Sequence, residues 1–216
     1  MKKILSGLAL AALLGTSAAM AANYEVTITN VTRGTVFTPI LVVSHAPGVK
    51  LFELGQPASD ELAALAEGGD TSLLAAALGT DSRVVDTADS GGPLLPGKSV
   101  TVTVKAPHGK GQVSLAAMLL PTNDGFIALN GAWAPRKRKE SMTYSSPGYD
   151  AGSEPNDELC VNIPGGGPCS GAGGSPGVGG EDYVHIHSGI HGIGDLLPGD
   201  FDWKNPAAHI TIRRVK

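Results

Sequence analysis

The stretch SVTVTVK, residues 99–105, alternates polar and apolar side chains without interruption. Because successive side chains of a strand point to opposite faces, its valines would lie on one face and its polar residues on the other. The pattern predicts a strand that is buried on one side. The stretch YEVTITNV, residues 24–31, repeats the alternation and predicts an earlier strand of the same kind.

Further strands are predicted on both sides of these two. Residues 36–44 are mostly apolar and β-branched, and Pro39 within them indicates an edge or a bulge, because proline cannot donate to a ladder. Residues 112–120 are apolar almost throughout, as in a strand that is covered on both faces or lies in a sandwich core. Shorter strands are predicted at 126–129, 183–187 and 208–215, with loops at 86–96 and 145–180.

Two short helices are predicted before the strand at 99–105. Ser59 can cap the first, which Gly68-Gly69 ends, and Asp70 or Thr71 can cap the second, which Gly79 ends. Many short strands between frequent turns, with helices confined to one insertion, predict a mainly β fold of the β-sandwich type.

The length of the chain, 216 residues, suits one compact domain. Charged residues make up 17% of the chain and hydrophobic residues 42%, which argues against wholesale disorder. The 30 glycines and 15 prolines argue against long helical bundles and coiled coils.

The beginning of the chain has the features of a secretory signal peptide. Two lysines precede an apolar run over residues 4–14, and Ala19-Met20-Ala21 supplies the small residues that a signal peptidase reads. We therefore expect a signal peptide at 1–21 and a mature domain at 22–216 that is exported, either to a periplasm or out of the cell.

No later segment is apolar over the length that a membrane span needs. The mature domain would carry 14 basic and 20 acidic residues, a formal charge of −6 that argues against nucleic-acid binding.

Export also bears on the two cysteines. Cys160 and Cys169 are nine positions apart in a stretch rich in glycine and proline. An oxidising compartment lets such a pair close a small loop, so we predict a disulfide between them.

The common enzyme signatures are absent. Residues 173–177 (GGSPG) fit the pattern G-x-S-x-G of hydrolases, but Pro176 has no N–H to donate to an oxyanion, and no buried strand precedes Ser175. The chain also lacks a P-loop, a dinucleotide-binding fingerprint and an H-E-x-x-H motif. We expect a protein that is not an enzyme.

Carboxylates and other oxygen donors are concentrated at residues 149–158, YDAGSEPNDE. Calcium takes six to eight oxygen ligands, and loops at one end of a sandwich often converge. Asp124, from a separate turn, could therefore meet Asp150 and Glu154 around one calcium ion. The alternative is that these acidic turns are simply solvated.

Three histidines offer a rival metal site. His185 and His187 would lie on one face of a strand, and His191 follows after a bend. They could hold zinc or copper, either in a metal-binding protein or in a metalloenzyme, although a blue-copper centre would also need a free cysteine. The alternative is an ordinary role at the surface or in packing.

The run Arg136-Lys137-Arg138-Lys139 is the one concentrated group of positive charge. It could bind a polyanion such as a glycan or an acidic membrane surface, or it could be a solvated loop.

Several segments together resemble the spondin N-terminal domain family, as found in F-spondin and mindin. The segment MLLPTNDGF at 118–126 is similar to the family pattern M-x-x-P-S-P-D-W-F, and YDAGSE at 149–154 is similar to Y-D-A-G-T-D. Further similar segments, in the expected order, are VFTPI at 36–40, LFELGQPAS at 51–59 and LAEGGD at 65–70.

The resemblance implies a C2-like antiparallel β-sandwich with a calcium ion at one end, bound by Asp124, Asp150 and Glu154. It further implies a non-catalytic recognition or adhesion module whose partner is an extracellular or envelope protein or a glycan. Two positions depart from the family pattern. Gly125 stands where the family usually has tryptophan, and Glu154 replaces an aspartate.

Overall fold

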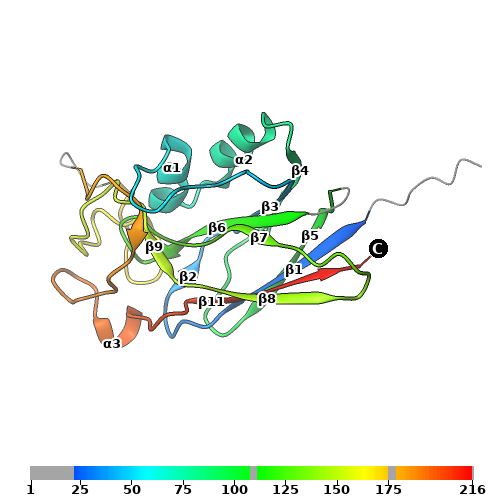
Figure 1. The fold of residues 1–216 in the computed structure, drawn as a ribbon. Helices are drawn as coiled ribbons and strands as arrows, with labels where there is room; N and C mark the ends of the chain where they lie inside the picture. Colours follow the sequence, from blue (N-terminus) through cyan, green and yellow to red (C-terminus); the bar gives the residue numbers. More distant parts are fainter. Residues whose placement is uncertain (1–21, 108–110, 175–178, 216) are drawn as a thin grey trace, which may run out of the picture.

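The computed structural model describes residues 22–107, 111–174 and 179–215 (Figure 1). The expected signal peptide at 1–21 and Ser175 lie outside these ranges. Two antiparallel sheets face one another, which confirms the predicted β-sandwich. Within the described ranges, no helix has both the length and the apolar character that a membrane crossing requires.

One sheet has four strands in the order β5-β1-β11-β8. These strands are β1 (Asn23–Asn30), β5 (Ser99–Lys105), β8 (Ser141–Ser146) and β11 (Ala208–Arg214). In β1 every second residue is buried, as the alternation of its sequence predicts. The strands predicted at 24–31, 99–105 and 208–215 are thus confirmed to within a residue.

The other sheet has seven strands. Six follow the order β10-β9-β7-β6-β3-β4, and β2 pairs separately with β6. Their bounds are β2 (Val36–Phe37), β3 (Leu41–His45), β4 (Val84–Asp89), β6 (Gln112–Leu120), β7 (Gly125–Trp133), β9 (Gly148–Asp150) and β10 (His185–Ile186).

Strand β6 is buried on both faces because it lies between two cores. Val113, Leu115 and Ala117 belong to the core between the sheets, while Ala116 faces the helices and packs in a second core with Leu62. This arrangement explains the continuous apolar run in its sequence.

The helices α1 (Asp60–Gly68) and α2 (Thr71–Gly79) cover the outer face of the larger sheet (Figure 1). The side chain of Ser59 accepts a hydrogen bond from the N–H of Leu62, and Asp70 accepts one from Ser72. Gly69 ends α1 in the left-handed conformation at φ 71°. Both predicted helices are therefore confirmed, with Asp70 rather than Thr71 as the second cap. A further short helix, α3 (Pro198–Phe201), precedes β11.

The sequence-based assignment is wrong where edge strands are polar. Strand β4 occupies part of the predicted loop at 86–96, and β8 (SMTYSS) was not predicted. Both lie at sheet edges and are partly or largely exposed, so they carry little of the apolar pattern that identifies a strand. The single strand expected at 36–44 is divided around Pro39 into β2 and β3.

Candidate functional site

Three strands bring the candidate residues together at the end of the sandwich drawn on the left of Figure 1. In the pairing of β7 with β9, Gly125 lies opposite Asp150, and in the pairing of β9 with β10, Asp150 lies opposite His185. Asp124 directly precedes Gly125. The register of short strands therefore places the predicted calcium turn, the acidic segment and the histidines in one place, which we call the tip.

Asp124 is fully buried, and only one of its oxygens is satisfied within the described residues. Its Oδ2 accepts the N–H groups of Ser153 (2.8 Å) and Glu154 (3.0 Å). Its Oδ1 is buried and has no hydrogen-bond partner there. Burial raises the pKa of Asp124 because it disfavours the charged form, and the nearby Asp150 carboxylate raises it further by repulsion. The pKa is about 7.

Asp150 is also fully buried, and each of its oxygens accepts a hydrogen bond. Oδ1 accepts the N–H of Gly152 at 2.8 Å, and Oδ2 accepts the side-chain amide of Asn156 at 2.6 Å. Both donors come from the loop after β9, so the carboxylate organises that loop.

The backbone N–H of Glu154 donates to Asp124 at the tip. Its side chain is buried, and a methyl group added at Gly174 would lie 3.7 Å from its Oε1. The structure thus joins Asp124 and Asp150 closely and places Glu154 beside them, with its carboxylate near the glycine loop.

Two of the three predicted histidines face Asp150. The Nε2 atom of His185 lies 3.7 Å from Asp150 Oδ1, and that of His187 lies 3.9 Å from Asp150 Oδ2. His191 is exposed, and its Nε2 lies 3.3 Å from the carbonyl oxygen of Ser188. The tip therefore gathers His185 and His187 but not the ring of His191.

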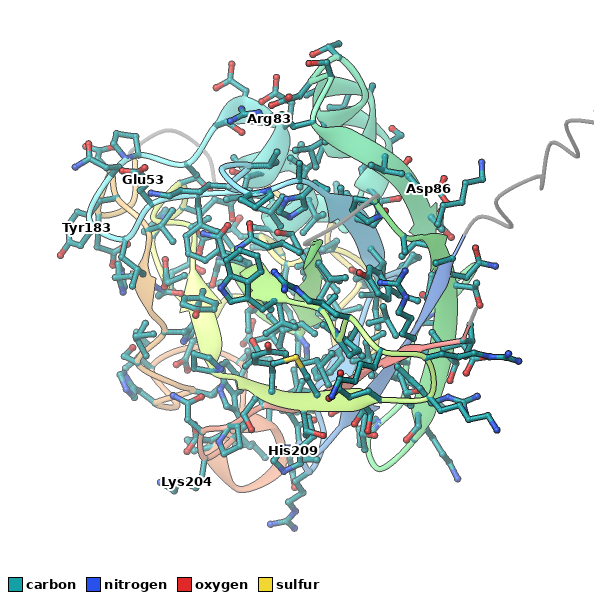
Figure 2. All side chains as sticks on the ribbon, turned by 45° about the vertical axis from the view of Figure 1, so that its right-hand side comes forward. Glu53, Arg83, Asp86, Tyr183, Lys204 and His209 are labelled. Carbon is teal, nitrogen blue, oxygen red and sulfur yellow. A yellow bond between two sulfur atoms is a disulfide. The ribbon has the colours of Figure 1, made fainter. Side chains whose placement is uncertain are left out.

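The two tip histidines differ in their surroundings. Burial lowers the pKa of His187, whose ring lies 5.0 Å from that of Trp203. Burial also opposes the charged form of His185, yet the Ile186 carbonyl together with Asp150 and Glu181 raises its pKa above 6.5. Tyr183 stands at the surface of this end (Figure 2) and packs on the His185 ring.

Glu181 is a tip residue that the sequence reasoning did not find. Its Oε2 lies 3.7 Å from His185 Nε2. Among the described residues, one group of metal-binding side chains has its donor atoms all within 4.8 Å of one another, and it consists of Asp150, Glu181 and His185. The signal in the sequence was a carboxylate four positions before a histidine, which is too common to single out.

A family model described as Spondin_N matches residues 23–155. The chain belongs to this family. A search of curated proteins finds no match. The Spondin_N span includes Asp124, Asp150 and Glu154, whereas Glu181 and His185 lie beyond it.

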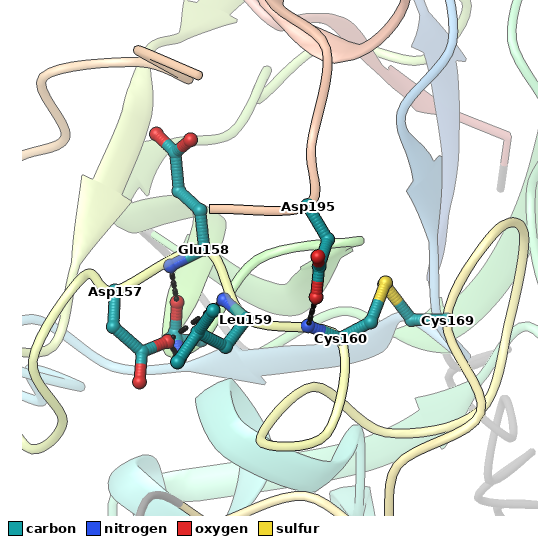
Figure 3. The surroundings of a disulfide bond; sticks show 7 residues. Asp157, Glu158, Leu159, Cys160, Cys169 and Asp195 are labelled. Carbon is teal, nitrogen blue, oxygen red and sulfur yellow. Dashed lines mark hydrogen bonds between the residues drawn. A yellow bond between two sulfur atoms is a disulfide. The ribbon is translucent and has the colours of Figure 1, made fainter. Parts of the chain in front are cut away.

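In this Spondin_N chain, a disulfide and a buried carboxylate hold together parts of the segment that follows the family match. The predicted disulfide between Cys160 and Cys169 is present, and the N–H of Cys160 donates to Asp195 (Figure 3). The Glu158 carboxylate accepts the backbone N–H groups of residues 191–193, at 2.7 Å for Gly192 and 3.0 Å for Ile193.

The basic run at 136–139 lies far from the tip. It connects β7 to β8 at Trp133, the end of β7 opposite to Gly125. Trp133 and Met142 line a surface groove beside Arg136 and Lys137. Any polyanion bound there would be separate from a ligand of the tip.

Proposed function

We propose that this protein is an exported, non-catalytic recognition or adhesion module whose tip is completed by a calcium ion. The observation that carries the proposal is the buried Asp124 Oδ1, which has no hydrogen-bond partner in the described residues beside a second buried carboxylate. A cation between them would favour the charged form of Asp124, whose pKa burial and the Asp150 carboxylate raise to about 7.

The chemistry of the available atoms fits a hard divalent cation. Asp124 and Asp150 would supply carboxylate oxygens, and Glu154, whose N–H donates to Asp124, would add its own carboxylate. Calcium accepts six to eight oxygens in flexible geometry, so backbone carbonyl groups and water would complete the shell. Glutamate is one methylene longer than the aspartate usual in the family and can still reach such an ion.

The ion would act structurally. It would fix the turn before β7 to the loop after β9, and these loops would then form a rigid surface for an extracellular or envelope protein or a glycan. Preorganised loops bind with a smaller entropy cost than mobile ones.

Thermal unfolding tests this proposal. Calcium at about 100 times its dissociation constant stabilises a folded protein by about 2.7 kcal/mol, which corresponds to a rise in Tm of roughly 5 to 10 °C for a chain of this size. EDTA should remove the rise. Asp124→Asn should abolish it, while Asp60→Asn, at an exposed position in α1, should leave it intact. Melting curves that are identical with EDTA and with calcium would contradict the proposal.

A further inference from the structure

The tip contains an unusual concentration of unsatisfied polar atoms. Four buried side-chain atoms lack a hydrogen-bond partner within the described ranges, and three of them belong to residues around Asp150: Asp124 Oδ1, His185 Nε2 and His187 Nε2. Buried polar atoms are nearly always paired, so such a cluster indicates a missing partner.

The separations between these atoms are too long for hydrogen bonds and suit a shared ion. His185 Nε2 lies 3.7 Å from both Asp150 Oδ1 and Glu181 Oε2. Zinc binds nitrogen and oxygen at about 2.0 to 2.1 Å, so the ligand atoms of a tetrahedral zinc ion are about 3.4 Å apart. Hydrogen bonds between the same atoms would be near 2.7 to 3.0 Å.

The hydrogen bonds of the ring nitrogens distinguish the two histidines. His185 Nδ1 lies 2.9 Å from the carbonyl oxygen of Ile186, so Nδ1 carries the proton and donates, and Nε2 keeps its lone pair. His187 Nδ1 instead accepts the N–H of Gly189 at 2.9 Å, so its neutral ring carries the proton on Nε2. His185 can therefore ligate a metal toward Asp150, whereas His187 presents an N–H to the other oxygen of that carboxylate.

The space for His187 depends on Gly125. A Cβ at position 125 would lie 3.0 Å from Cδ2 of His187 and 2.7 Å from Oγ1 of Thr122. The absence of a side chain at position 125 thus leaves room for the imidazole of His187.

We infer that Asp150 Oδ1, Glu181 Oε2 and His185 Nε2 form a transition-metal site for an ion of the zinc class, with His187 as a positioning residue. An imidazole nitrogen favours zinc over calcium, which prefers oxygen. The side chains of His185 and Glu181 are partly exposed, and three protein donors leave a fourth position for water or for a donor from a partner. The site shares Asp150 with the proposed calcium site but does not require calcium.

Zinc titration of the metal-free protein, in competition with a chromophoric chelator, tests the site. The wild type should bind one zinc ion per chain. His185→Gln and Glu181→Gln should each weaken binding by at least about tenfold, since each removes one ligand of three. His191→Gln and Asp182→Asn are matched controls at neighbouring exposed positions and should bind as the wild type does. Cobalt bound at the same site should give the intense visible absorption of a tetrahedral centre in the wild type but not in His185→Gln.

The results also separate this inference from the calcium proposal. Asp124→Asn should keep zinc binding and lose calcium stabilisation. His185→Gln should lose zinc binding and keep calcium stabilisation. A wild type that takes up no zinc, a His185→Gln variant that binds zinc as tightly as the wild type, or an equal loss in His191→Gln would each overturn the inference. The first result would leave His185 as a histidine between two carboxylates without a metal.

Discussion

Gly125 shows how one residue shapes the tip. Its φ is not positive, so other residues could adopt its backbone conformation, but its neighbours leave no room for a side chain. Gly125→Ala should therefore lower the free energy of unfolding by about 1 to 3 kcal/mol, the usual cost of overpacking a close contact. Gly92→Ala is the matched control, because nothing lies within 4 Å of a Cβ added there. Urea unfolding of the two variants would measure the difference, and equal losses would argue against the close packing of His187 on Gly125.

His45 makes stability depend on pH. Its ring is fully buried, with Nε2 at 2.9 Å from the hydroxyl of Ser114 and Nδ1 at 2.8 Å from the carbonyl of Ala46. Burial lowers the pKa of His45 below 6.5 despite the Ala46 carbonyl, which favours the charged form.

The sign of the effect follows from proton uptake. As the pH falls below about 6.5, the unfolded chain binds a proton at His45 that the folded chain does not, so the free energy of unfolding decreases. The contribution is fully present above this pH. Urea unfolding at pH 7 and pH 5 should show a smaller decrease for His45→Gln than for the wild type. In His45→Gln the free energy of unfolding should still decrease with falling pH, but by less, because the lowered pKa of His187 acts in the same direction. An equal decrease in His45→Gln and in the wild type would show that His45 does not cause the pH dependence.

At the scale of elements, Glu158 connects two loops that no strand joins. Hydrogen bonds from N–H groups to a carboxylate contribute about 1.5 to 3 kcal/mol each when buried. Glu158→Gln should therefore lower the free energy of unfolding and speed hydrogen exchange at residues 191–193. Glu53→Gln, at an exposed ion pair with Lys50, should change neither. Unaltered exchange in Glu158→Gln would mean that other contacts hold the 191–193 loop.

The elements differ in how far their sequences reveal them. Alternation and capping residues were enough for β1, β5 and both helices, because local physics and tertiary packing agree there. Strand β8 could not be found in this way, because one neighbouring strand and its backbone hydrogen bonds define it while its side chains remain polar. Strand β10 was predicted longer than it is, since pairing with β9 ends after Ile186.

At the scale of the whole molecule, the candidate site arises from strand register. The sequence predicted that Asp124 and Asp150 would approach one another and that His185 and His187 would share a face. It kept the acidic residues and the histidines as rival sites, because nothing local indicates that β10 pairs with β9 and sets His185 opposite Asp150. Glu181 joins the group for the same reason. The short pairing of β10 with β9 thus places the predicted calcium ligands and the predicted histidine ligands at one tip.

Cations at this tip are central to both proposals, and a crystal structure of the protein with calcium and zinc would test for them most directly. Diffraction data collected on both sides of the zinc absorption edge would distinguish the two ions. We predict an anomalous zinc peak bounded by Asp150 Oδ1, Glu181 Oε2 and His185 Nε2, and a calcium ion in contact with Asp124 Oδ1. A tip without either ion, in crystals grown with both at concentrations well above those that saturate such sites, would contradict the account.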